Sequence, residues 1–228
     1  MFPAPLLSIF GMKIYFYNLA HVGGFVPALV LALILARGRR IALKLVLEAW
    51  LVCLVADLGL ARLLVAFLQQ FDPIIPIQWS LAQIITVLGA LGVYAALRPR
   101  ELGFWNSLGD AMDIAAPPVA LYIAIARLGC FAAGCCYGII AENLPWAVTF
   151  TNPHAATIYK NIPTHPTQLY EVVSALVILA LVLALRHRAA WRGSLMLVFI
   201  LAYALMRLVI ELFRGDLQPM VGVLLSFA

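Results

Sequence analysis

Three arginines lie inside long apolar stretches, where a charged side chain is costly and usually serves a function. Arg62, Arg127 and Arg207 each fall within such a stretch. A guanidinium group carries a planar fork of N–H donors that matches two oxygens of a phosphate. We therefore expect the three arginines to bind the phosphate of a lipid headgroup. The alternative is that they pair only with carboxylates and carbonyls of the chain itself.

Two carboxylates can neutralise part of this charge. Glu171 follows Arg127 along the chain, and Glu211 lies four residues after Arg207 and three before Arg214. This spacing predicts that Arg207, Glu211 and Arg214 share one helix face. Positive charge remains in excess, which favours an anionic ligand over purely internal pairing.

The segment His-Pro-Thr-Gln-Leu-Tyr-Glu, residues 165–171, opens an apolar stretch. One interpretation is the start of a helix, with Pro166 in the first turn and the Thr167 hydroxyl as its cap. That interpretation leaves His165 unexplained. A histidine beside an arginine cluster is a candidate general base.

Three cysteines, Cys130, Cys135 and Cys136, follow Arg127 in a glycine-containing stretch. A buried cysteine most often fills space in the core, but these three are also candidate reactive thiols. Nearby arginines lower the pKa of a thiol, whereas burial raises it. In a straight helix Cys130 and Cys135 would face different directions, and no Cys-x-x-Cys or His-rich spacing is present. We therefore favour packing over a redox pair or a nucleophile, and we predict no metal site.

The composition defines what must hold these residues in place. Hydrophobic residues make up 65% of the chain and charged residues 11%, with a mean hydropathy of +1.03. These values exclude a soluble domain and predict an all-α, polytopic membrane bundle. Six apolar stretches are long enough to span a bilayer, at residues 14–36, 42–68, 79–97, 114–135, 169–185 and 194–213. The tail, 219–228, predicts a partial or truncated seventh span. We expect no cleavable signal peptide, because the first stretch reaches full spanning length with no basic segment before it.

Basic residues set the expected orientation. Alternate linkers carry nine of them, namely Arg37, Arg39, Arg40, Lys44, Arg98, Arg100, Arg186, Arg188 and Arg192. The opposite side carries Lys13, Lys160 and Arg214. The positive-inside rule then places the N-terminus outside and the candidate site residues in the outer leaflet. Residues 1–228 are expected to form one membrane domain, and 138–168 an ordered outside (periplasmic) loop.

Several of these motifs together resemble one protein family. Arg127-Leu-Gly-Cys-Phe, followed by Gly134 and Tyr137-Gly138, is similar to the signature Gly-Arg-x-Gly-Asn-Phe-x-Asn-x-Glu-x-x-Gly. Residues 165–171 resemble His-Pro-Ser-Gln-Leu-Tyr-Glu. A third pattern is carried by Tyr203, Arg207, Glu211, Phe213, Arg214 and Asp216. The chain is identified on these motifs as a divergent member of the bacterial prolipoprotein diacylglyceryl transferase family.

The resemblance implies an enzyme of the bacterial inner membrane with seven spans. Such an enzyme moves diacylglyceryl from phosphatidylglycerol to the thiol of a lipobox prolipoprotein, without a metal or organic cofactor and without nucleic acid. It implies four catalytic residues, Arg127, Arg207, His165 and Glu211. It also implies seven substrate-binding residues, Arg62, Tyr137, Gln168, Tyr170, Glu171, Tyr203 and Arg214.

The sequence departs from the family pattern beside these residues. Cys130 and Ala133 replace the two asparagines of the signature, Cys135 replaces its glutamate, and Thr86 falls where the third span has a histidine. Two alternatives therefore stay open. One is a paralogue with a different acceptor, or with an intermediate linked to Cys130 or Cys135. The other is a non-catalytic lipid-binding or chaperone-like membrane protein.

Overall fold

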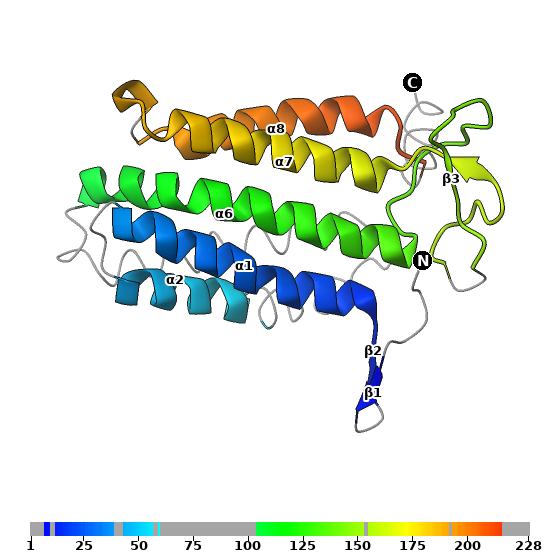
Figure 1. The fold of residues 1–228 in the computed structure, drawn as a ribbon, viewed down its shortest axis with the longest axis horizontal. Coiled ribbons are helices and arrows are strands. Elements are labelled where there is room, and N and C mark those ends of the chain that lie inside the picture. The colour runs from blue at the N-terminus through cyan, green and yellow to red at the C-terminus, as the bar shows by residue number, and fades with distance from the viewer. Residues whose placement is uncertain are drawn as a thin grey trace, which may run out of the picture.

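The structure is a computed structural model that describes residues 7–9, 12–38, 43–56, 59, 104–152, 155–191 and 193–215. Within these residues five α-helices run along the long axis (Figure 1). They are α1 (Phe16–Gly38), α2 (Leu43–Val55), α6 (Phe104–Ala133), α7 (Thr167–Leu185) and α8 (Leu195–Glu211). A 3-10 turn, η2 (Ala189–Trp191), joins α7 to α8, and a short hairpin of β1 (Leu7–Ile9) and β2 (Met12–Ile14) precedes α1.

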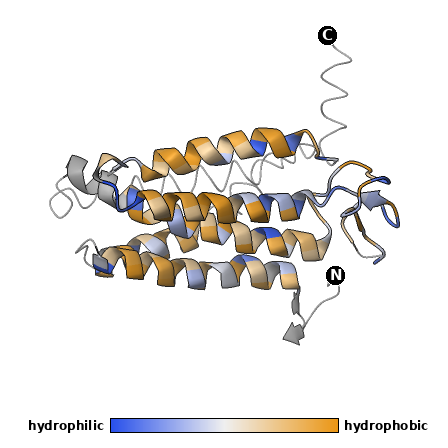
Figure 2. Cartoon of the chain, turned by 45° about the horizontal axis from the view of Figure 1, so that its top comes forward, coloured by the Kyte–Doolittle hydropathy of each residue, from blue (hydrophilic) through white to orange (hydrophobic). Residues whose placement is uncertain are grey.

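Three of these helices contain segments long and apolar enough to cross a membrane, Leu19–Gly38, Met112–Ala133 and Thr167–Leu185. Figure 2 shows apolar residues covering the helices along most of their length. A membrane helical protein is thereby confirmed. The predicted stretch at 42–68 is described only in part, and those at 79–97 and 219–228 lie outside the described residues. The count of six spans and a partial seventh stays a prediction.

The outer surface of α1 shows why the bundle needs lipid around it. Large apolar side chains are exposed every three or four residues along one face, at Leu19, Val22, Val26, Val30 and Ile34. This spacing gives a continuous apolar stripe along one side of the helix. In water such a stripe would be a liability, whereas in a bilayer it meets acyl chains.

The opposite side of α1 packs closely against α6. A Cβ added at Gly129 would lie 2.8 Å from the Cβ of Ala20, which is closer than real Cβ atoms approach. Gly24 in turn lies against the side chains of Tyr122 and Ile125. Small residues at a crossing let the backbones of two membrane helices come close, so dispersion contacts can hold them together.

The main core lies between α6, α7 and α8. Ala116 and Ala120 of α6 leave room for buried residues of the other two helices, which are Ile178, Val182, Leu195 and Phe199. The buried carboxylate of Asp113 accepts hydrogen bonds from the backbone N–H groups of Gly193 (2.7 Å) and Leu195 (2.8 Å). It thereby satisfies donors at the start of α8 that have no partner within the helix.

The connection between α6 and α7 folds at one end of the bundle (Figure 1). Two short strands, β3 (Val148–Thr149) and β4 (Pro163–Thr164), pair antiparallel within it. Phe150 is fully buried and forms a small core with Tyr137 and Ala155. The described part of this loop therefore has a hydrophobic core of its own.

Candidate functional site

The charged residues predicted to act together gather at the end of the bundle that carries the loop. Arg127 lies near the end of α6, Glu171 near the start of α7, and Arg207 and Glu211 near the end of α8. Because α7 runs opposite to α6 and α8 (Figure 1), the end of one helix meets the start of the next. Arg62, also predicted for this site, lies outside the described residues.

Glu171 is the centre of this network and is almost completely buried, with 1% of its side chain exposed. Its Oε1 accepts a hydrogen bond of 2.6 Å from Nη1 of Arg207. Its Oε2 forms an ion pair with Arg127, with 2.6 Å between Oε2 and Nε. The angle at the N–H group does not suit a hydrogen bond. The Nη1 of Arg214 lies 3.5 Å from Oε1. One carboxylate therefore holds three arginines from three segments of the chain.

Glu211 provides the second negative charge, because its Oε2 lies 2.9 Å from Nη2 of Arg207. The prediction that Arg214 shares this helix face is wrong. Helix α8 ends at Glu211, and the turn that follows carries Arg214 to Glu171 instead. Among the described members of this network, arginines outnumber carboxylates by three to two, and the Cys136 thiol lies beside Arg127.

Backbone pairing fixes the segments around this network. Gly138 forms an isolated bridge with Arg214, and its N–H donates to the carbonyl of His165 (3.0 Å). A Cβ at Gly138 would lie 2.5 Å from the Cβ of His165 and 2.8 Å from the carbonyl oxygen of Phe213. Three segments thus meet at a residue whose lack of a side chain allows the contact.

His165 lies one step outside the arginine network. Its Nδ1 lies 3.1 Å from the Tyr170 hydroxyl, and its ring packs against Phe213 in a tilted arrangement with ring centroids 5.0 Å apart. The Tyr170 hydroxyl also accepts a hydrogen bond of 2.9 Å from the indole of Trp146. Trp146 was not predicted to belong to the site. In the sequence, only its position among prolines in a long loop indicated that Trp146 lies in an ordered part of the chain.

The start of α7 differs from the prediction in one detail. The N-cap is Pro166, without a side-chain cap, so the predicted cap by Thr167 is wrong. The Thr167 hydroxyl instead donates to the carbonyl of Cys136 (2.7 Å), and the Gln168 amide donates to the carbonyl of Cys135 (2.6 Å). Both side chains are fully buried. The first residues of α7 therefore hold the cysteine-containing turn in place.

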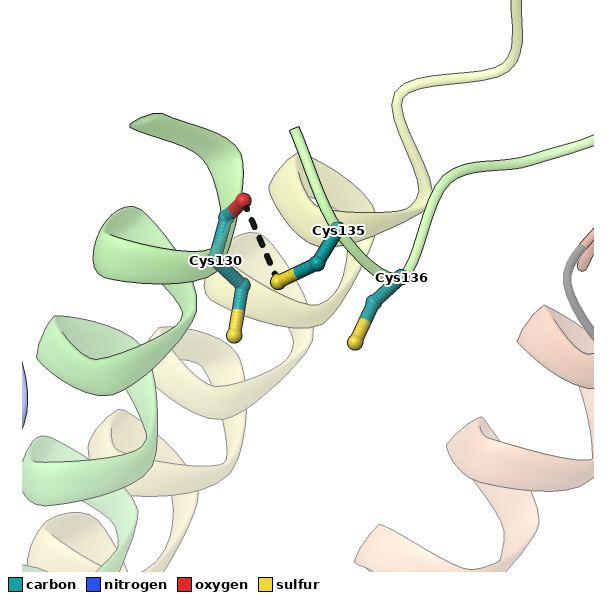
Figure 3. A group of neighbouring side chains, drawn as sticks. All are labelled: Cys130, Cys135 and Cys136. Carbon is teal, nitrogen blue, oxygen red and sulfur yellow. Dashed lines mark hydrogen bonds between the residues drawn. The ribbon is translucent and has the colours of Figure 1, made fainter. Parts of the chain in front are cut away.

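That turn brings the three cysteines together, contrary to the prediction that Cys130 and Cys135 face different directions. Helix α6 ends at Ala133, and Gly134 and Cys136 have positive φ angles of 72° and 57°. The chain thereby folds back over the helix end. All three Sγ atoms lie within 4.8 Å of one another, and the Cys135 thiol donates to the Cys130 carbonyl at 3.6 Å (Figure 3).

The two thiols in the turn have opposite acidities. Hydrogen-bonding contact with the thiols of Cys130 and Cys135, helped by the charges of Arg127 and Arg214, lowers the pKa of Cys136 against the effect of burial. Hydrogen bonding to Cys130 and Cys136, together with burial, raises the pKa of Cys135. The Nη1 of Arg127 lies 3.6 Å from Sγ of Cys136. For Cys136, the arginine charges act in the same direction as these contacts and against burial.

The remaining predicted residues have packing contacts as well. Tyr137 is buried against Tyr159 in the loop, with ring centroids 5.5 Å apart. Tyr203 is stacked on Phe199 at 5.9 Å, at the edge of the main core. The Oε1 of Gln168 is buried without a hydrogen-bond partner among the described residues.

Comparisons with known proteins identify the family of the chain. A sequence model of the prolipoprotein diacylglyceryl transferase family matches residues 5–228. The chain is 34% identical over 136 residues to a protein of Clostridium tetani, covering 60% of this chain and 52% of that one. It is 33% identical over 131 residues to one of Dehalococcoides mccartyi, covering 54% and 50%. A protein of Finegoldia magna is 28% identical over 224 residues, covering 92% and 82%.

All three relatives are named phosphatidylglycerol–prolipoprotein diacylglyceryl transferase. The chain spans about half the length of the first two. The family match extends over nearly the whole chain and includes every described residue of the arginine network. The chain therefore belongs to the prolipoprotein diacylglyceryl transferase family.

Proposed function

We propose that the protein transfers diacylglyceryl from phosphatidylglycerol to the thiol of a lipobox prolipoprotein. The observation that carries this proposal is the buried Glu171 with three arginines around it, at one end of a membrane bundle. A cluster richer in arginines than in carboxylates favours an anionic ligand, and the guanidinium fork matches the oxygens of a phosphodiester. The names of the relatives supply the donor and the acceptor.

Arg127 and Arg207 would bind the headgroup phosphate. Both are partly exposed, at 21% and 28%, whereas Glu171 behind them is at 1%. The carboxylate therefore acts as a positioning residue that fixes the two guanidinium groups before the lipid arrives. Fixed donors aimed at a developing negative charge are an effective form of transition-state stabilisation.

In the reaction, the acceptor sulfur would attack the glycerol carbon that bears the phosphate. The S–C bond forms, the C–O bond breaks, and glycerol phosphate leaves with its charge held by Arg127 and Arg207. His165 would take the thiol proton. In the tautomer whose Nδ1–H donates to the Tyr170 oxygen, Nε2 is the basic nitrogen. The Tyr170 oxygen has a second lone pair, which accepts the hydrogen bond from the Trp146 indole.

The remaining assignments follow from the same scheme. Arg62, Arg214 and Glu211 would orient the phosphate-binding arginines, and Tyr137, Gln168, Tyr170 and Tyr203 would line the substrate site. The protein would be a single domain of the bacterial inner membrane with six spans and a partial seventh. Its N-terminus and the loop 138–168 would be outside, so that the site takes lipid from the outer leaflet. No cofactor is needed for the transfer.

A second candidate function is transfer through an intermediate linked to a cysteine of this chain. The observation that favours it is the 3.6 Å contact between Arg127 and the Cys136 thiol, which places a sulfur beside a proposed phosphate ligand. In that scheme a cysteine of the cluster, and not the lipobox thiol, attacks the lipid first.

The experiment uses purified protein with phosphatidylglycerol labelled in its headgroup, with and without a lipobox peptide. We expect release of labelled glycerol phosphate only when the peptide is present. Release without peptide, together with a diacylglyceryl adduct on the protein, would favour the second candidate. Lipid binding without any release would contradict both and leave a non-catalytic lipid-binding protein.

A further inference from the structure

We propose that Cys130, Cys135 and Cys136 form a binding site for a soft, monovalent metal ion, Cu⁺, beside the arginine network. Their three Sγ atoms lie within 4.8 Å of one another (Figure 3), close enough to bind a single ion. The sequence predicts no such site, because its spacing matches no common metal motif. The proposal goes beyond lipid transfer and does not depend on it.

The sulfurs converge because the backbone of the turn is fixed by groups other than the sulfurs. The N–H of Cys135 donates to the Cys130 carbonyl (3.2 Å), and Thr167 and Gln168 hold the carbonyls of Cys136 and Cys135. The hydrogen bond from the Cys135 thiol to the Cys130 carbonyl is long at 3.6 Å. Because S–H is a weak donor, losing that bond on metal binding costs little. The site is therefore largely preorganised.

The set of donor atoms favours Cu⁺ over other ions. Within the described residues the group consists of three cysteines, with no histidine or carboxylate. Structural zinc is almost always bound by four protein ligands in a tetrahedron. Soft thiolates select Cu⁺, which accepts a ligand shell made of sulfur alone.

The surroundings also suit the charge of such a complex. Three thiols that lose their protons to solvent carry three negative charges, and Cu⁺ neutralises one of them. Arg127, which also pairs with Glu171, lies 3.6 Å from the Cys136 sulfur and places positive charge of the arginine network beside the remaining thiolates. Proton release is the only chemical change, and no oxidation state changes, so binding requires no oxidant or reductant.

The experiment titrates the reduced, full-length protein in detergent micelles under anaerobic conditions. Cu⁺ is supplied as a complex with a chromogenic chelator, so that transfer to the protein is read from the loss of colour. We expect one Cu⁺ per chain in the wild type. The chain has four cysteines. When copper is bound, a thiol reagent should modify only Cys53, because the other three thiols are metal ligands.

The single variants are Cys130→Ser, Cys135→Ser and Cys136→Ser. Loss of a residue that only hydrogen-bonds to a metal ligand lowers metal affinity roughly 10- to 100-fold. Because each variant removes a ligand itself, its Cu⁺ affinity should fall by more than that. Cys53→Ser is the matched control, because Cys53 lies on α2 outside the cluster. It should bind Cu⁺ as the wild type does. Helical circular dichroism and gel filtration would show whether each variant folds, and the thiol count on the wild type needs no variant.

Three results would overturn the proposal. They are no stoichiometric Cu⁺ binding by the wild type, equal affinity in the cluster variants and Cys53→Ser, or tighter binding of Zn²⁺ than of Cu⁺. None of these readouts uses lipid transfer. A failure here would leave the proposed transferase function standing, and an inactive transferase could still bind copper.

Discussion

Glu171 accepts a hydrogen bond of 2.6 Å from Arg207, which joins the start of α7 to the end of α8. The same carboxylate lies 2.6 Å from Arg127 of α6, so three helices are joined at one buried charge. Buried ion pairs seldom add net stability, but breaking one leaves an unpaired charge away from water. The network is thus a sensitive point both for the fold and for the proposed binding of phosphate.

Glu171→Gln should destabilise the protein and abolish lipid transfer. Removing one partner of a buried ion pair costs about 3–5 kcal/mol, and here three guanidinium groups lose their common partner. Thermal unfolding in detergent, followed by circular dichroism, would measure the loss. Glu142→Gln, an exposed carboxylate of the loop, is the control and should unfold as the wild type does. Equal midpoints for the two variants would show that Glu171 does not hold the site together.

Arg127→Lys and Arg207→Lys should restore little of the activity that Arg127→Ala and Arg207→Ala lose. An ammonium group keeps the charge, but it lacks the planar fork that contacts two phosphate oxygens. Initial rates of glycerol phosphate release provide the measurement. Arg188→Lys, at an exposed position between α7 and α8, is the control. Near-normal rates in both Lys variants of the site would rule out two-point phosphate binding.

Gly138→Ala should lower stability sharply, because its Cβ would lie 2.5 Å from both the Cβ and the carbonyl oxygen of His165. The backbone bridge to Arg214 would have to shift, which would move a member of the network. Gly23→Ala is the matched control, since a Cβ there meets nothing within 4 Å. Unfolding midpoints of the two variants should differ clearly. If both behave alike, the close packing at Gly138 is not needed.

The proposed orientation can be tested with single cysteines at exposed positions. Lys160→Cys lies in the loop between α6 and α7, and Arg188→Cys lies at the other end of α7. A membrane-impermeant thiol reagent should label the first in intact cells and the second only after lysis. Peptide mass spectrometry separates both from the native cysteines. The reverse pattern would place the arginine network on the cytoplasmic side.

Local sequence patterns predicted four of the described helices well because long apolar stretches leave few alternatives in a membrane. The stretch at 169–185 became α7 with a start only two residues earlier. Helix α6 begins ten residues before the predicted 114. Residues 104–113 include several polar side chains, so a search for apolar stretches does not detect this first part of α6. Asp113, for example, is explained only by its contacts with the start of α8.

The sequence indicated which charged residues would gather, but only part of their geometry. Helical spacing predicted the contact between Arg207 and Glu211, which is confirmed at 2.9 Å. It could not show that Glu171 collects three arginines, because those contacts join segments far apart in the chain. The cysteine cluster was missed because helical periodicity was extended past Ala133, whereas the positive φ of Gly134 reverses the chain there. Backbone turns of this kind leave little trace in residue spacing.

Transfer of diacylglyceryl into a lipobox peptide tests the central claim most directly. The purified protein is incubated with phosphatidylglycerol and a peptide that contains one cysteine, and the peptide is weighed by mass spectrometry. We expect a gain of one diacylglyceryl group on that cysteine with the wild type, and none with Arg127→Ala or with a peptide carrying serine instead. An unmodified peptide in the presence of folded, lipid-bound wild-type protein would contradict the proposal that this protein is a transferase acting on a lipobox thiol.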